Sequence, residues 1–430
     1  MNKTLLFLKD RFSKYYQTAQ IQLPDRFTRR EWGFLYLGES FMQRHLAFRR
    51  TADVTQFLSG GLSKHAKKKI NYHQTNIPAH VYYSSAYYQE PALQPMPAKV
   101  EGWLGADLIF DLDDDHLRNI EGLTTEERLK KVKDIVRNKL LDDFILTDLG
   151  FDEKYIKIAF SGSRGYHIHI KDPKVFGMSS AERREIVDYL TGTGLNLDRI
   201  FPNEVFDTKE YMGKKYSKKP KIVTPKLDSP GWRGRMARGI LELINNIRNL
   251  PDEDGLAELK GICQNLRYKG KAIPEKDIED IYYELFSGSK LKIDEKTFEN
   301  RNVLEIFSRD RLRDIFLELV REHQKVEMAG ETDEPVTTDV KRLIRLPTSL
   351  HGKTGFRVVP IEINELSDFD PFKDTLAFSS EPVKVNIIYN ELFKFRLANE
   401  HFTIRPDTGT IELPEFAAVY LMCQRKAEII

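Results

Sequence analysis

Two carboxylates with the spacing of a metal site lie about a quarter of the way along the chain. Residues 106–113 read Ala-Asp-Leu-Ile-Phe-Asp-Leu-Asp. Successive side chains of a strand point to opposite faces, so Asp111 and Asp113 share a face, with Cα atoms roughly 6.5 Å apart. From that separation they can converge on one hard cation or bridge two. An Asp-x-Asp pair also arises by chance. This pair ends an apolar strand, however, where an unpaired charge is costly, and that location favours a metal site.

A second segment joins two strand-like runs through a turn rich in glycine and hydroxyls. Residues 156–170 comprise Ile-Lys-Ile-Ala-Phe, then Ser-Gly-Ser-Arg-Gly, then Tyr-His-Ile-His-Ile. The glycines let the backbone of the turn approach a ligand closely. Three residues of the turn offer donors suited to phosphate oxygens, namely Ser161, Ser163 and Arg164. His167 and His169 share a face of the second strand. An ordinary structural hairpin stays open as an alternative, as does a zinc site, although no third ligand follows at a useful spacing.

A third segment, residues 333–355, places acids before bases. It reads Asp-Glu-Pro-Val-Thr-Thr-Asp-Val-Lys-Arg-Leu-Ile-Arg-Leu-Pro-Thr-Ser-Leu-His-Gly-Lys-Thr-Gly. Thr337 or Thr338 is suited to cap a short helix that continues through Arg345. Pro347 would end this helix, and a basic, glycine-containing turn follows. Three bases could reach one polyphosphate: Arg345, His351 and Lys353. The alternative is a capped helix whose basic last turn complements its dipole.

The composition is that of a globular protein that can bury a sizeable core. The chain has 430 residues, of which 40% are hydrophobic and 31% charged. We expect a cytoplasmic protein without a membrane segment, because no signal peptide or bilayer-spanning run is visible and two cysteines are too few for a disulfide framework. The net charge of +2 conceals a basic stretch at residues 207–238, with ten Lys and Arg against three acids. This stretch suits a phosphate backbone or is only a solvated loop.

The order of helical and strand patterns predicts an α+β fold in which helices interrupt the sheet-forming sequence. Thr124 and Glu127 form the pattern of a capping box at the start of a helix. A hairpin is expected at residues 402–413, turning at Asp-Thr-Gly. We predict three parts: the first part of a mixed-sheet catalytic domain (1–231), a mainly helical subdomain (232–330), and the second part of the catalytic domain with the C-terminal segment (331–430).

Together the three motif segments resemble the catalytic small subunit of archaeal DNA primases, in the archaeo-eukaryotic primase family. The resemblance rests on residues 105–113, 161–167 and 345–355, which occur in the family's order. Each motif alone is modest, whereas the ordered combination is highly specific. The similarity extends over most of the chain, including Arg-Glu-Trp-Gly-Phe at 30–34 and Asp-Pro-Phe-Lys-Asp at 370–374. It is least clear in the helical insertion.

The resemblance implies a primase-type mixed sheet and a role for each motif residue. Asp111 and Asp113 match the family's paired ligands for Mg²⁺ or Mn²⁺, and Asp333 matches its third acid. The residues that match the family's contacts to the phosphates of the incoming nucleotide are Ser161, Ser163, Arg164, His167, Arg345 and His351, with Arg44 as a weaker match.

The function implied by the resemblance is that of a DNA primase. It would make short primers de novo on single-stranded DNA for replication, by template-directed, two-metal nucleotidyl transfer. Its substrates would be nucleoside triphosphates; the choice between NTPs and dNTPs stays open, because no residue can be named that reads the 2′ position. The implied partners are the DNA template and a large primase subunit in a heterodimer.

One departure from the family pattern is plain. Members usually carry a cysteine-rich zinc module between the aspartate pair and the Ser-Gly turn, and this chain has no cysteine there. We therefore expect no structural zinc. Two rival functions remain: a metal-dependent phosphoesterase that uses the acids with His167 and His169, and a non-catalytic nucleic-acid-binding subunit.

Overall fold

The computed structural model describes residues 3–60, 76–117, 122–204, 208–211, 214–217, 221–264, 266–286, 303–324 and 337–430. The chain forms two compact units. The first unit comprises Met1–Val187 and Glu327–Ile430, and the second comprises Asp188–Val326. Helices and antiparallel sheets are both present, so the α+β prediction is confirmed. The predicted division into domains at residues 231 and 330 stays a prediction.

Two four-stranded antiparallel sheets form the centre of the first unit. One has the order β15-β3-β1-β2 and the other the order β16-β7-β8-β6. The strands of the first sheet are β1 (Trp32–Tyr36), β2 (Met42–Leu46), β3 (Pro78–Ser84) and β15 (Leu343–Arg345). The strands of the second are β6 (Leu108–Asp113), β7 (Ile156–Phe160), β8 (Gly165–Ile170) and β16 (Val359–Ile361). A short hairpin of β4 (Ala86–Tyr88) and β5 (Trp103–Ala106) lies between the two sheets in the sequence.

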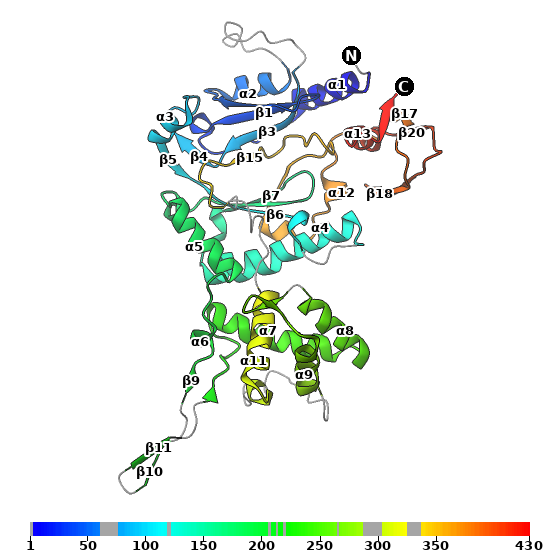
Figure 1. Cartoon of the computed structure of the whole chain (residues 1–430). Coiled ribbons are helices and arrows are strands. Elements are labelled where there is room, and N and C mark those ends of the chain that lie inside the picture. The colour runs from blue at the N-terminus through cyan, green and yellow to red at the C-terminus, as the bar shows by residue number, and fades with distance from the viewer. Residues whose placement is uncertain are drawn as a thin grey trace. The chain divides into compact units, whose positions relative to one another are not determined.

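Helices cover the outer faces of these sheets. Helices α1 (Lys3–Thr18) and α2 (Thr51–Leu58) lie against the first sheet (Figure 1), where Phe57 contacts Phe34 of β1. Helix α4 (Thr125–Asp134) begins at the predicted capping box and continues into the π-helical segment η4 (Ile135–Asp148). The box is formed, since the backbone N–H of Thr124 donates to Glu127 Oε2 at 2.7 Å and the N–H of Glu127 donates to Thr124 Oγ1 at 3.3 Å.

The C-terminal part of the first unit returns to the N-terminal helix. Strands β17 (Pro382–Ile387), β20 (Thr410–Pro414) and β21 (Ala427–Ile429) form a three-stranded sheet, and β18 (Phe393–Leu397) pairs with β19 (Glu400–Ile404). Both chain ends lie close together in Figure 1, and the N–H of Ile429 donates to Thr4 Oγ1 at 3.2 Å. Further helices of this unit are α3 (Met96–Glu101), α12 (Pro371–Asp374) and α13 (Glu415–Cys423), and α5 (Ser180–Thr191) crosses the boundary between the units.

The second unit is mainly helical. Its helices include α6 (Leu197–Ile200), α7 (Gly231–Arg248), α8 (Asp252–Cys263), α9 (Glu275–Phe286) and α11 (Asp310–Gln324). In the described part of this unit, three two-stranded pieces accompany them: β9 (Asn203–Glu204) with β12 (Lys221–Ile222), β10 (Thr208–Tyr211) with β11 (Lys214–Ser217), and β13 (Arg267–Tyr268) with β14 (Lys271–Ala272). Short 3-10 turns in the two units are η1 (Phe27–Arg29), η3 (Asp114–His116), η5 (Glu153–Tyr155), η6 (Pro173–Val175), η7 (Val303–Ile306) and η8 (Ile363–Glu365). No helix among the described residues has both the length and the apolar character needed to cross a bilayer.

Two local predictions are wrong. In both cases the strands that form, or their partners, differ from those expected. The helix expected to run through Arg345 is instead a turn followed by β15, which pairs with β3 so that Arg345 lies opposite Tyr82. Pairing with β3 supplies hydrogen-bond partners to the backbone of residues 343–345, and Ile344 is buried in that sheet. The expected hairpin at residues 402–413 also fails, because β19 pairs with β18 whereas β20 pairs with β17.

Candidate active site

The paired aspartates lie on β6, an outer strand of the second sheet. In the register of β6 with β8, Asp111 lies opposite His167 and Asp113 lies opposite Gly165. A Cβ atom at position 165 would lie 2.1 Å from Asp113 Oδ1 and 2.0 Å from the carbonyl oxygen of Leu112. Gly165 therefore lets the carboxylate of Asp113 lie directly against the neighbouring strand, an approach that any larger residue prevents.

The surroundings of Asp113 fit a bound cation. Its Oδ1 atom is buried and, within the described part of the chain, has no hydrogen-bond partner. Burial and the negative charge of Asp111 raise the pKa of Asp113. A hard divalent cation takes oxygen ligands and would offset both effects with its positive charge. No three acids, histidines or cysteines of the described residues are arranged to hold a metal ion, and Asp333, the expected third acid, lies outside those residues.

His167 lies beside the aspartates in the interior of the sheet. Its side chain is almost wholly buried, and its Nε2 atom is 3.4 Å from Asp111 Oδ1. Burial, and then the positive charge of Arg345, lowers the pKa of His167 to about 4. The imidazole is therefore neutral near pH 7, and a neutral imidazole could contact a phosphate oxygen only by donating a hydrogen bond.

The Ser-Gly turn contacts the third motif segment. Ser161 is buried, and its hydroxyl accepts a hydrogen bond from the N–H of Gly165 at 3.3 Å, which closes the turn. Gly162 adopts a φ of +87°, and a Cβ atom there would lie 2.8 Å from the Cβ of His351. The hydroxyl of Thr354 donates to the carbonyl of Gly162 at 2.7 Å. The fold thus brings two segments that lie nearly two hundred residues apart into contact.

Arg164 and Ser163 lie at the exposed side of the same turn. Ser163 is half-buried, whereas Arg164 is exposed and forms an ion pair with Asp115. The Nε atom of Arg164 is also 3.9 Å from Asp114 Oδ1. A partly exposed ion pair of this kind is worth about 1 kcal/mol or less, so a triphosphate could replace the acid as partner of the guanidinium at small cost.

A cavity of about 430 Å³ lies between the two sheets in the first unit. Five of the predicted site residues line it: Arg44, Asp111, Asp113, His167 and Arg345. The predicted residues that do not line it are Ser161, Ser163, Arg164 and His351. Residues that line it and were missed include Met42, Tyr82, Asp339, Lys341, Arg342, Leu343 and Ile344. Acidic side chains on β6 therefore face a set of basic side chains across one cavity.

The basic side chains come from β15, the turn before it, and β2. The guanidinium of Arg345 lies 5.7 Å from the ring centroid of Tyr82, its partner in the strand register. Arg44 donates from Nε to Glu31 Oε1 at 3.2 Å. Glu31 is fully buried and also accepts from Lys99 Nζ at 2.9 Å, so its position is fixed from two sides. Two guanidiniums thus line the cavity, and each retains donors for an anion.

His351 does not line this cavity and lies in a buried contact of two histidines. Its ring centroid is 4.6 Å from that of His80, in an edge-to-face arrangement. Its Nδ1 atom is 3.2 Å from Thr354 Oγ1. Burial, followed by the charge of Arg345, lowers the pKa of His351 well below its ordinary value, so it too is neutral near pH 7.

Two signals in the sequence could have found more of this site. Tyr82 belongs to a run of strand-forming residues, 79–83, in which alternation puts it on one face with His80. Lys341 and Arg342 precede Arg345 in one motif, and an assignment of 343–345 as a strand would have placed a basic turn directly before it. The sequence gives no sign that β2 and β15 belong to the same sheet.

Comparison with known proteins settles the family. Residues 110–363 match the family model described as DNA primase small subunit. The chain belongs to the DNA primase small subunit family. It is 38% identical over 431 residues to the DNA primase small subunit PriS of Methanothrix thermoacetophila, covering 100% of this chain and 99% of that protein. It is also 38% identical to PriS of Methanocella arvoryzae, covering 99% of each chain, and 37% identical to PriS of Methanococcoides burtonii, covering 99% of this chain and 98% of that protein.

Membership in the DNA primase small subunit family confirms the resemblance on which the sequence-based expectations rested. The matched range contains the aspartate pair, the Ser-Gly turn and the basic segment at 345–355. All three segments belong to the first unit, and both the aspartates and Arg345 line its cavity.

Proposed function

We propose that this chain is the catalytic subunit of a DNA primase, which starts strands on single-stranded DNA by joining nucleoside triphosphates. One observation carries the proposal: the same-face pair Asp111 and Asp113 opens into a cavity whose other walls present four basic side chains, those of Arg44, Lys341, Arg342 and Arg345. Acids that bind a cation, set opposite bases that bind an anion, suit a metal-bound triphosphate.

The aspartates are the residues that would hold Mg²⁺ or Mn²⁺, together with Asp333. When bound, such cations make the attacking hydroxyl more acidic and offset charge on the triphosphate. Asp111 and Asp113 would supply oxygen ligands from a strand of the sheet. Because they bind the cation, no side chain is needed as a general base.

The basic residues act on the triphosphate. In the proposed reaction a 3′-hydroxyl loses its proton to solvent water and its oxygen forms a bond to the α-phosphorus. The bond from that phosphorus to the bridging oxygen breaks, and pyrophosphate leaves in line with its electron pair. Negative charge builds on the pyrophosphate, where Arg345 and Arg44 offset it. In this proposal His167 donates a hydrogen bond to a phosphate oxygen inside the cavity. Ser161, Ser163 and Arg164 would contact phosphates that extend beyond the cavity to the Ser-Gly turn, and His351 would do so from the segment hydrogen-bonded to that turn.

The partners follow from the proposed reaction. A single-stranded DNA template directs the sequence, and the substrates are NTPs, dNTPs or both. A large primase subunit binds the chain in a heterodimer, which acts in the cytoplasm where template and nucleotides are available. The three-part domain division, 1–231, 232–330 and 331–430, assigns catalysis to the first and third parts. We propose no structural zinc for this chain, because no cysteine lies between Asp113 and Ser161.

A direct assay tests the proposal. The purified chain is incubated with unprimed single-stranded DNA, Mg²⁺ or Mn²⁺, and either NTPs or dNTPs, with and without the large subunit. We expect short oligonucleotides, and we expect Asp111→Ala with Asp113→Ala to abolish them. Unchanged synthesis by the double variant would refute the assignment of the catalytic acids. Release of mononucleotides from a strand, without synthesis, would support a phosphoesterase instead.

A further inference from the structure

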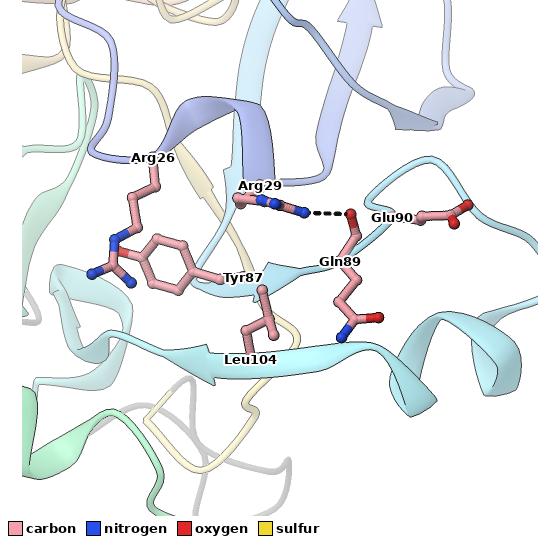
Figure 2. Close-up of a pocket in the computed structure, with 6 residues that line it drawn as sticks. All are labelled: Arg26, Arg29, Tyr87, Gln89, Glu90 and Leu104. Atoms are coloured by element: carbon pink, nitrogen blue, oxygen red, sulfur yellow. Dashed lines mark hydrogen bonds between the residues drawn. The ribbon is translucent and has the colours of Figure 1, made fainter.

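A second cavity, of about 520 Å³, lies in the first unit away from the aspartates. It lies between the η1 turn and the β4–β5 hairpin (Figure 2) and shares no lining residue with the catalytic cavity. The described residues that line it are Arg26, Arg29, Tyr87, Gln89, Glu90 and Leu104. We call it the Arg26–Arg29 site.

Arg26 has an unusual backbone conformation and no acidic partner among the residues that the structure describes. Its backbone is left-handed, with φ 50° and ψ 38°, a conformation that costs a non-glycine residue about 1–2 kcal/mol. Its guanidinium lies 5.7 Å from the ring centroid of Tyr87 and 5.4 Å from that of Phe176. The neighbouring carboxylate of Asp25 pairs with Lys171 instead. No ion pair of Arg26 is found within the described residues, so its N–H groups remain available to a ligand.

Arg29 presents a second guanidinium one turn further along. Its Nη1 atom donates to the carbonyl of Gln89 at 2.9 Å, a bond that Figure 2 shows across the cavity. Glu90 is the one carboxylate among the six residues that line the site, and neither arginine forms an ion pair with it. The lining therefore carries a net positive charge, which favours an anionic ligand.

Tyr87, which lines the site, is held in place by a buried hydrogen-bond network. The hydroxyl of Tyr87 donates to Asp107 Oδ1 at 2.8 Å, and Asp107 forms a fully buried ion pair with Arg30 at 2.8 Å. The ring of Tyr87 over which the Arg26 guanidinium lies is therefore fixed before a ligand arrives, and a preformed surface lowers the entropy lost on binding.

We propose that the Arg26–Arg29 site binds the phosphodiester backbone of the single-stranded template, an inference that rests on the proposed primase function. Guanidiniums pair with phosphate oxygens in a two-point geometry. Leu104 is half-exposed and provides an apolar wall beside them. Leu104 is also seven residues from Asp111, so the site lies within about 25 Å of the catalytic acids. An OB fold contacts roughly 4–16 nucleotides of a single strand, and a strand segment of that length would reach both places.

The salt dependence of binding tests the proposal. Each phosphate contact to a single strand contributes a slope of about −0.7 in the plot of log K against log salt concentration. Replacing both contacts in Arg26→Gln with Arg29→Gln should therefore make the slope shallower by about 1.4. The measurement uses fluorescence anisotropy of a labelled 30-nucleotide poly(dT), with the full chain at several salt concentrations.

Two matched variants separate this effect from a change in net charge or in folding. Lys384→Gln with Lys394→Gln removes the same charge from exposed positions on β17 and β18 and should leave the slope unchanged. Arg26→Lys with Arg29→Lys keeps the charge and should restore most of the slope. In primer synthesis, the double glutamine variant should raise the KM for template and leave the KM for nucleotide unchanged.

The outcomes separate this inference from the proposed function. If the wild-type chain makes primers but the glutamine variant shows the wild-type salt slope, the inference is overturned and the primase function stands. If the variant loses affinity for the large subunit instead of for DNA, the site is a protein contact and the inference is again overturned. If the wild-type chain makes no primers yet the slope falls as expected, the DNA site stands and the proposed function fails.

Discussion

Gly165→Ala should damage the catalytic site from the strand opposite the metal-binding acids. The new Cβ would lie 2.1 Å from Asp113 Oδ1 and 2.0 Å from the carbonyl oxygen of Leu112, and Cβ contacts below 3.0 Å are essentially never observed. The carboxylate and the strand must therefore move apart by about 1 Å, a displacement that can cost about 100-fold in rate when it misplaces a catalytic group.

The same substitution should cost little stability compared with its effect on catalysis. Introducing a methyl group into a packed region costs about 1–3 kcal/mol, which leaves a domain of ordinary stability folded. Metal ligation is less tolerant of such a displacement, because metal–ligand distances vary by only about 0.2 Å. We therefore expect primer synthesis to fall at least about 100-fold and the affinity for Mn²⁺ to fall with it, while thermal unfolding stays cooperative.

The measurement pairs primer synthesis on unprimed DNA with calorimetric titration of Mn²⁺. Gly177→Ala is the matched control, because a Cβ at position 177 would meet no atom within 4 Å. Wild-type synthesis and Mn²⁺ affinity in a folded Gly165→Ala protein would refute the argument that the glycine admits the Asp113 carboxylate. A loss of activity that follows only the unfolded fraction would refute it as well.

Further predictions concern the buried polar groups. His167→Ala should weaken nucleotide binding while the fold stays intact; normal binding of a labelled nucleotide would remove His167 from the site. Burial lowers the pKa of His80 to about 3. As the pH falls through about 6.5, the unfolded chain therefore takes up a proton that the folded chain does not. This histidine should reduce the free energy of unfolding by roughly 1.5 kcal/mol between pH 6.5 and pH 5. His80→Phe should remove that part of the pH dependence in urea titrations, and an unchanged pH dependence would contradict it. Asp107→Ala leaves the guanidinium of Arg30 buried without its ion-pair partner and should lower the free energy of unfolding by about 3–5 kcal/mol. Replacing an exposed acid, in Glu126→Ala, should lower it by at most about 1 kcal/mol. Equal effects of the two substitutions in thermal unfolding would show that burial does not set the cost.

Local patterns predicted the elements that depend on local physics. The run at 108–113 forms a strand because its alternation and apolar residues suit a half-buried sheet. Helix α4 begins directly after its N-cap, Thr124, because the capping box satisfies free N–H groups within four residues. The family was also evident from the order of three short motifs. None of these conclusions required knowledge of what lies across the sheet.

Predictions from the sequence failed where a pairing partner distant in the chain decides the local structure. Residues 343–345 contain enough helix-compatible side chains to predict a helix, but β3 offers an unpaired edge, and pairing with it outweighs local preference. The same pairing brings Tyr82 and Arg345 together and places Arg342 beside the aspartates. The site was therefore predicted as a set of residues, but not as a cavity with these walls.

The amino-acid sequence by itself determined which chemical groups are present, that two carboxylates share one strand face, and to which family the chain is related. The tertiary structure alone decided which bases face those carboxylates, that Gly165 is needed for their close approach to β8, and that Arg26 and Arg29 form a separate cationic site. The physical reason is that strand alternation and helix capping act over a few residues, whereas sheet pairing and burial act between residues that only folding brings together.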